Sequence, residues 1–126
     1  DSFVIIKTDA GEVRVDIEEA TTPMEKVKGL TGRPVIEKGM FFIYDREGDY
    51  SFTTLGMEAP IDIIFIDSSE KIVDMKKSVE PGVEVIQSSI PFQFVLETKA
   101  GFADEKNIKS GQKVNWFLAT EKDGNK

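Results

Sequence analysis

The segment GMEAPIDIIFID, residues 56–67, contains the run that decides the fold. Between Ile61 and Ile66 every residue except Asp62 is apolar, so both faces of an extended chain are mostly apolar here. Such a run, bounded by Pro60 and a polar turn, is typical of a central strand that is covered on both sides. It predicts a β-rich core. It also raises the question of how Asp62 is accommodated, because an unpaired buried charge is costly.

Further extended segments lie before and after this strand. Residues 3–7 and 12–18 are predicted to form a hairpin around a turn at 9–11, because Val13, Val15 and Ile17 alternate with polar residues. Other apolar runs separated by turn residues are also predicted as strands. They are GMFFIYD (39–45), YSFTTL (50–55), KIVDMKKSV (71–79), FQFVLETKAG (92–101) and the segment that follows Gly111.

A change of period near residue 22 predicts one short helix. Thr22 and Glu25 have the spacing of a capping box, Pro23 suits the first helical turn, and Gly32 offers a stop. A helix this short is not stable without packing on the sheet. The residues expected to make that contact share one face and are Met24, Val27 and Leu30.

Seven or eight strands with one helix near residues 22–31 predict a mainly β fold, either a β-sandwich or a partly closed barrel. Too few helices are expected to supply the crossovers of a parallel α/β sheet. The sequence has no repeat, linker or low-complexity block. Residues 1–126 are therefore expected to form a single β-rich domain, with 121–126 as a frayed polar tail.

Composition excludes several classes of function. The net charge of −7 opposes binding to nucleic acid, and the scattered lysines and arginines form no basic patch. The chain has no histidine and no cysteine, which removes His-based and thiolate chemistry. We predict no metal and no cofactor. No apolar run is long enough to span a bilayer. Because the chain begins with Asp1, a removed leader that made the protein secreted or membrane-anchored is one expectation, and a cytoplasmic location is the alternative.

Two motifs are the most specific in the chain: T-P-x-E-x-x-x-G-L-x-x-R at residues 22–33 and P-I-D-I-x-F-I-D at residues 60–67. Together with GMFFIYD and FVLETKAGFADEKNIKSGQKV, they resemble, in order and spacing, the small prokaryotic family catalogued as domain of unknown function one-nine-two. The likeness runs from about Val13 to Trp116. It implies a compact, mainly β domain with one short helix, often found behind a secretion signal or membrane anchor. It implies no activity.

The chain departs from this family pattern in one segment. After the phenylalanine matched by Phe52, members commonly have an aromatic residue, a methionine and a basic residue, followed by asparagine or glycine. Here the corresponding residues are Thr53, Thr54, Leu55 and Gly56. If the segment forms a ligand site in the family, its aromatic wall and positive charge are missing from this chain.

Asp62 is the first candidate for a special role. Its predicted partner is Arg33, which follows the helix and has a planar fork suited to a bidentate carboxylate contact. Such a pair either pins the helix to the sheet or lies in a functional cleft. The candidate ligand-binding residues are accordingly Arg33, Asp62, Gly56, Met57 and Thr54.

A structural role is predicted for the capping residues Thr22 and Glu25, and for Arg33 and Asp62 as a pair. No catalytic residue is assigned in the leading hypothesis. Most aromatic residues are expected in the core, whereas an exposed Trp116 or Tyr50 would favour stacking on a sugar ring.

The leading hypothesis is a non-enzymatic domain that binds a small molecule, a glycan or a protein segment, at the cell envelope, in a recess near the helix end and residues 56–62. The alternative is a carboxylate-dependent hydrolase with Asp62 as general base. A third hypothesis is an interaction module that adds a partner strand to an exposed sheet edge. Nucleotide-binding and serine-hydrolase motifs are absent from the sequence. The partner, the ligand and the oligomeric state are left open.

Overall fold

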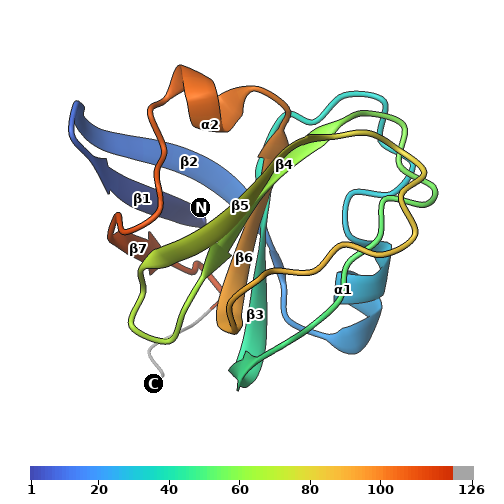
Figure 1. Ribbon diagram of the computed structural model, residues 1–126, viewed down its shortest axis with the longest axis horizontal. Coiled ribbons are helices and arrows are strands. Elements are labelled where there is room, and N and C mark those ends of the chain that lie inside the picture. The colour runs from blue at the N-terminus through green and yellow to red at the C-terminus, as the bar shows by residue number, and fades with distance from the viewer. Residues whose placement is uncertain (121–126) are drawn as a thin grey trace.

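Within residues 1–120, which are those that the computed structural model describes, seven strands join into one sheet that curls into a partly closed barrel (Figure 1). The tail predicted at 121–126 lies outside the described residues. The spatial order is β5-β4-β6-β3-β2-β1-β7. In chain order the strands are β1 (Phe3–Thr8), β2 (Gly11–Ala20), β3 (Gly39–Gly48), β4 (Ile61–Ile66), β5 (Ile72–Val79), β6 (Phe92–Lys99) and β7 (Val114–Phe117).

The two outer strands, β5 and β7, approach each other at one end. The amide of Ile72 donates to the carbonyl of Gln112 (3.0 Å), and the amide of Val114 donates to the carbonyl of Glu70 (2.9 Å). These bonds close part of the gap between the sheet edges. The prediction of a mainly β fold with one short helix near residues 22–31 is confirmed, and the partly closed barrel is the architecture that forms.

Local patterns in the sequence account for most strands. The predicted hairpin is formed by β1 and β2, which pair Phe3 with Asp16 and Thr8 with Gly11. All six residues of β4 are buried, and the strand lies between β5 and β6. This confirms the interpretation of residues 61–66 as an interior strand.

Two features of the sheet differ from the prediction. Strands β2 and β3 pair in parallel, because the chain from residue 21 to 38 crosses over between them. Residues 50–55 form no regular strand and contribute only the bridge between Phe52 and Ile86. The hydroxyl of Thr53 donates to the carbonyl of Val83 (2.9 Å), and that of Thr54 donates to the carbonyl of Glu80 (2.7 Å). These side chains hold the segment in a loop instead of a ladder.

The predicted helix is α1 (Pro23–Lys28). Its capping box is confirmed: the Thr22 hydroxyl accepts from the Glu25 amide (3.1 Å), and the Glu25 carboxylate accepts from the Thr22 amide (3.1 Å). The helix ends at Gly29, with φ of 47°, and not at Gly32.

The predicted packing of α1 on the sheet is wrong for two of its three apolar residues. Leu30, just after the helix, is buried, but Met24 and Val27 are each 84% exposed. The six-residue helix has no buried residue of its own. Its caps and the segment after it therefore hold it in place, and its apolar side chains are left at the surface.

The sheet has an apolar cluster on each face. Figure 1 shows α1 on one side of β3, β6 and β4, with β1, β2, β7 and the second short helix, α2 (Phe102–Glu105), on the other. The cluster on the α2 side includes Phe41 and Leu96. The cluster on the α1 side includes Phe42 and Val95 and is covered by Leu30 and by loop residues. Neither helix in residues 1–120 has the length and apolar character needed to cross a membrane.

Candidate functional site

Asp62 is buried, but its partners are backbone amides. Asp62 is 1% exposed. Oδ1 accepts from the Ser78 amide (2.8 Å), and Oδ2 accepts from the Ala103 amide (2.9 Å). The predicted pair of Asp62 with Arg33 is therefore wrong.

A β-bulge explains the first of these bonds. Ile61 pairs with Val79, whereas Ile63 pairs with Lys76, so β5 has one extra residue opposite Asp62. The extra residue of a bulge leaves an amide outside the ladder. The Asp62 carboxylate accepts from that amide and, on its other oxygen, from the first turn of α2. Asp62 therefore joins β5 and α2 to β4, and its burial keeps the carboxylate away from a substrate in a cleft.

Arg33 binds Glu18 of β2 in place of Asp62. Both guanidinium ends contact the Glu18 carboxylate, with Nη2 at 2.9 Å from Oε1. The hydrogen bond from Arg33 is the main cause that lowers the pKa of Glu18, and the same bond raises the pKa of Arg33. The segment after α1 is thus tied to the sheet by an ion pair, as predicted, but at β2.

The remaining predicted ligand residues lie in one loop. Thr54 is fully buried and holds the chain at residues 80 and 83 through its hydroxyl, which donates to Glu80 and accepts from the Val83 amide (2.9 Å). Gly56 has φ of +82°, and its carbonyl accepts from the Gly32 amide (3.1 Å). Of the five candidates, all within residues 1–120, only Met57 lines the cleft that follows.

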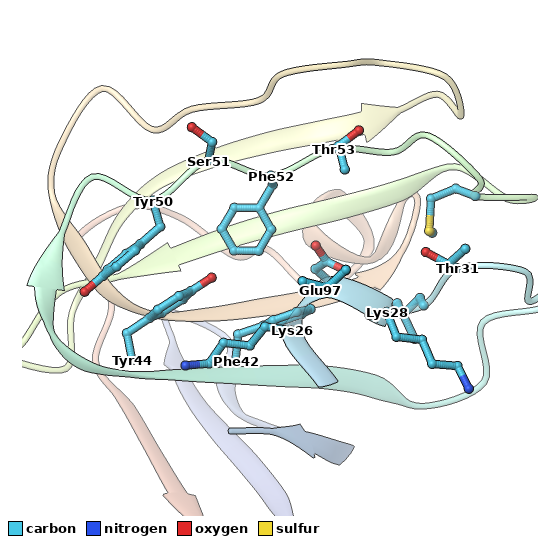
Figure 2. Close-up of a pocket in the computed structure, with 14 residues that line it drawn as sticks. Lys26, Lys28, Thr31, Phe42, Tyr44, Tyr50, Ser51, Phe52, Thr53 and Glu97 are labelled. Atoms are coloured by element: carbon cyan, nitrogen blue, oxygen red, sulfur yellow. The ribbon is translucent and has the colours of Figure 1, made fainter. Parts of the chain in front are cut away.

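A cleft of about 360 Å³ lies between α1 and the sheet (Figure 2). One wall is formed by residues 26–31, the helix and its C-terminal end. The other walls come from Phe42 and Tyr44 of β3, from the loop at 50–53 and from Met57, and Glu97 of β6 also lines the cleft. The recess was predicted near the helix end and residues 56–62. The cleft lies at the helix end, but Met57 is the one residue of 56–62 that lines it, and most of its lining was not predicted.

The aromatic walls of the cleft pack against one another. Tyr44 and Tyr50 are stacked with ring centroids 3.9 Å apart. Phe42 and Phe52 meet edge to face at 5.4 Å. The Tyr50 hydroxyl is bonded to the carbonyl of Arg46 (2.6 Å), and Figure 2 shows it at the outer end of the cleft. The Tyr44 hydroxyl is directed toward the middle. These contacts fix the rings before any ligand arrives.

Glu97 was missed by the sequence analysis. It lies in the middle of β6, between Met40 of β3 and Ile63 of β4, and is 5% exposed. Burial raises its pKa to about 8, and no hydrogen bond or charge from residues 1–120 contributes to that shift. Burial, followed by the charge of Glu97, raises the pKa of Tyr44. The cleft therefore contains a buried carboxyl without a protein partner among the described residues.

Two lysines of α1 border the cleft. The Lys26 ammonium lies 4.2 Å from the centroid of the Tyr44 ring. Figure 2 shows the Lys28 ammonium directed away from the cleft. In the described part of the chain no three acidic side chains gather closely enough to hold a metal ion.

Comparisons with known proteins identify a family and a relative whose descriptions state no activity. The family DUF192, described as "Uncharacterized ACR", matches residues 4–116, which confirms the predicted resemblance. A UPF0127 protein of Thermococcus sibiricus is 27% identical over 118 residues, which cover 92% of this chain and 73% of the relative.

Two solved structures share the fold. A protein of unknown function from Novosphingobium aromaticivorans is 28% identical, with a TM-score of 0.87 over 90% of this chain and 84% of that protein. A protein of Sinorhizobium meliloti 1021, described as a proposed transcription regulator, is 23% identical, with a TM-score of 0.86 over 92% of this chain and 94% of that protein. The second likeness shows the fold alone.

Proposed function

This chain belongs to the uncharacterised family DUF192, and because that description carries no activity, we propose from the cleft itself that the protein binds a small molecule between α1 and the sheet. The observation that carries the proposal is Glu97, a buried carboxyl in the cleft that has no partner among residues 1–120. A location at the cell envelope stays a prediction of the family resemblance.

A buried polar group without a hydrogen-bond partner destabilises a protein by about 1–3 kcal/mol. Groups of this kind, with strongly shifted pKa values, concentrate at functional sites, where a ligand supplies the missing contact. Asp62 shows the opposite case in the same sheet, since both of its oxygens accept backbone hydrogen bonds. The contrast supports a binding role for Glu97 and an architectural role for Asp62.

The shape of the cleft supports the same function. Its volume of about 360 Å³ is within the range of small-molecule sites, which are largely apolar with a few polar groups. The rings of Phe42, Tyr44, Tyr50 and Phe52 are held by their mutual contacts. A ligand that enters therefore orders few side chains, which lowers the cost of binding.

Two tryptophan variants on α1 test the proposal. Val27 and Met24 are each 84% exposed, but only Val27 lines the cleft. Val27→Trp places an indole at the cleft mouth, and Met24→Trp is the matched control. A library of small organic compounds would be screened by chemical-shift changes in two-dimensional NMR spectra.

We expect some compounds to shift the amide resonances of residues 26–31, 42–44 and 97 in the wild-type protein and in Met24→Trp. The affinity of Val27→Trp for the same compounds should be at least tenfold lower. The proposal fails if no compound perturbs these amides. It also fails if Val27→Trp binds the same compounds as tightly as Met24→Trp does.

A further inference from the structure

We propose that the cleft binds an organic cation, with its ammonium group against the Glu97 carboxylate and its apolar part against Phe42 and Phe52. The inference rests on the proposed function and names the chemical class of the ligand.

The groups that face the interior of the cleft are electron-rich. Besides the carboxyl of Glu97, they are the rings of Phe42 and Phe52 and the thioether of Met57. Aromatic faces attract cations and repel anions. A buried carboxylate that gains an ammonium partner forms a charge-assisted hydrogen bond, about twice as strong as a neutral one. The interior is therefore complementary to positive charge.

The charged and titratable groups around Glu97 come from three segments: Lys26 and Lys28 of α1, Tyr44 of β3, and Tyr50 of the following loop. Tyr50 stacks on one face of the Tyr44 ring, so the Lys26 ammonium lies over the other face. Figure 2 shows Lys28 pointing outward. Among the ion pairs of residues 1–120, none joins either lysine to Glu97. The site beside this carboxyl is thus open to a ligand cation, and the net charge of −7 attracts one to the protein.

An apolar surface continues from the cleft along α1. Val27 lines the cleft and also borders a shallow apolar depression formed with Pro23, Met24 and the stem of Lys28. Exposed apolar side chains next to a binding site provide contact area for a ligand that extends beyond it. An amine that carries an alkyl chain can place its ammonium group in the cleft and its chain against the apolar depression on α1.

Proton linkage gives the proposal a distinctive pH dependence. With the pKa of Glu97 at about 8, most molecules carry a neutral carboxyl at pH 7 and an ionised one at pH 9. An alkylammonium ion, like a lysine side chain, keeps its charge throughout this interval. Cation binding should therefore strengthen by roughly tenfold from pH 7 to pH 9 and should release a proton at pH 7.

Three six-carbon probes that differ in charge test the class of ligand: n-hexylammonium, n-hexanol and n-hexanoate. Their affinities for the wild-type protein would be measured by calorimetry and NMR at pH 7 and pH 9. We expect hexylammonium to bind at least tenfold more tightly than the other two at pH 9, and to be the only probe whose affinity rises with pH. In Glu97→Gln, with its fold checked by circular dichroism, the preference and the pH dependence should both be lost.

Equal or tighter binding of hexanol or hexanoate in the cleft would overturn the cation assignment while leaving the small-molecule function intact. An affinity for hexylammonium that is flat or falls between pH 7 and pH 9 would overturn it as well. Because the pH series uses the wild-type chain, it does not depend on the folding of any variant.

Discussion

Asp62 on β4 and Glu97 on β6 are diagonal neighbours in the sheet, and their side chains project from opposite faces. Asp62 pairs in register with Thr98, and Glu97 pairs with Ile63. Residues directly opposite each other share a face, and successive residues alternate. Two buried acids one step apart thus have different surroundings. Asp62 accepts two backbone hydrogen bonds, whereas Glu97 lies in a cleft.

Removal of the Asp62 carboxylate should be strongly destabilising. Asp62→Ala leaves two amides without their acceptor, the buried amide of Ala103 and the partly buried amide of Ser78. A buried unsatisfied group costs about 1–3 kcal/mol, and a partly buried one costs less. We expect a loss of roughly 2–5 kcal/mol in the free energy of unfolding, measured by urea denaturation. Asp62→Asn, which keeps one acceptor oxygen, should lose less. An Asp62→Ala protein as stable as the wild type would contradict the architectural role.

Glu97 should make the protein less stable as pH rises. Its pKa is raised from the ordinary 4.5 to about 8, so the folded protein keeps a proton that the unfolded chain has already lost. The stabilisation that comes from this raised pKa is fully present below pH 4.5. It is lost progressively as the pH rises from 4.5 to about 8. Over that interval we expect the free energy of unfolding of Glu97→Gln to rise, relative to that of the wild type, by about 1.4 kcal/mol per pH unit.

Urea denaturation at pH 5 to pH 9 would measure this gain. Glu12→Gln, an exposed position on β2, is the matched control and should follow the wild-type trend. A constant difference between Glu97→Gln and the wild type across this range would argue against a protonated Glu97.

The pair of Arg33 and Glu18 should contribute modestly, because both side chains are more than a third exposed. A double-mutant cycle with Arg33→Ala and Glu18→Ala is expected to give a coupling of about 0.5–1 kcal/mol. Because the pKa of Glu18 is lowered, this stability is present above its ordinary value of 4.5 and is lost as pH falls below it. Coupling that persists undiminished at pH 2 would be inconsistent with an ion pair.

Gly56 should be difficult to replace. Its φ is +82°, and a Cβ atom there would lie 3.0 Å from the Cγ2 methyl of Thr31, a residue of the cleft wall. Gly82→Ala is the control, because Gly82 has φ of +92° but open space around it. We expect Gly82→Ala to lose about 1 kcal/mol and Gly56→Ala to lose more. Adding Thr31→Ser to Gly56→Ala removes the contacted methyl and should reduce the loss of stability to that of Gly82→Ala. Equal losses in the two single alanine variants would exclude the contact as a cause.

The fold was predictable where the signal is local. Alternation in residues 12–18, the apolar run at 61–66 and the capping box of Thr22 and Glu25 each depend on a few neighbouring residues. The partners of Asp62 were not predictable in this way, because they are backbone amides at a bulge and at a helix more than fifteen residues away. The pattern of side chains in the sequence does not indicate which backbone amides are free to bind a carboxylate.

Glu97 was missed for a related reason. Gln93, Glu97 and Lys99 lie on the face of β6 opposite Phe92, Phe94 and Leu96, which is close to the pattern of a strand with one solvent-exposed face. Residues 26–31, residues 50–53 and Met57, all distant in sequence, cover that face at Glu97. The signal that could have pointed to Glu97 is Val95, an apolar residue two positions before it and therefore on the same face of β6.

The proposed cation site depends most on the state of the Glu97 carboxyl, which a ¹³C NMR titration observes directly. The resonance would be assigned by its absence from Glu97→Gln and followed from pH 4 to pH 10. We predict an apparent pKa of about 8 in the free protein and a lower value with n-hexylammonium bound. A pKa near the ordinary 4.5 in the free protein would contradict the claim that this carboxyl is buried without a partner.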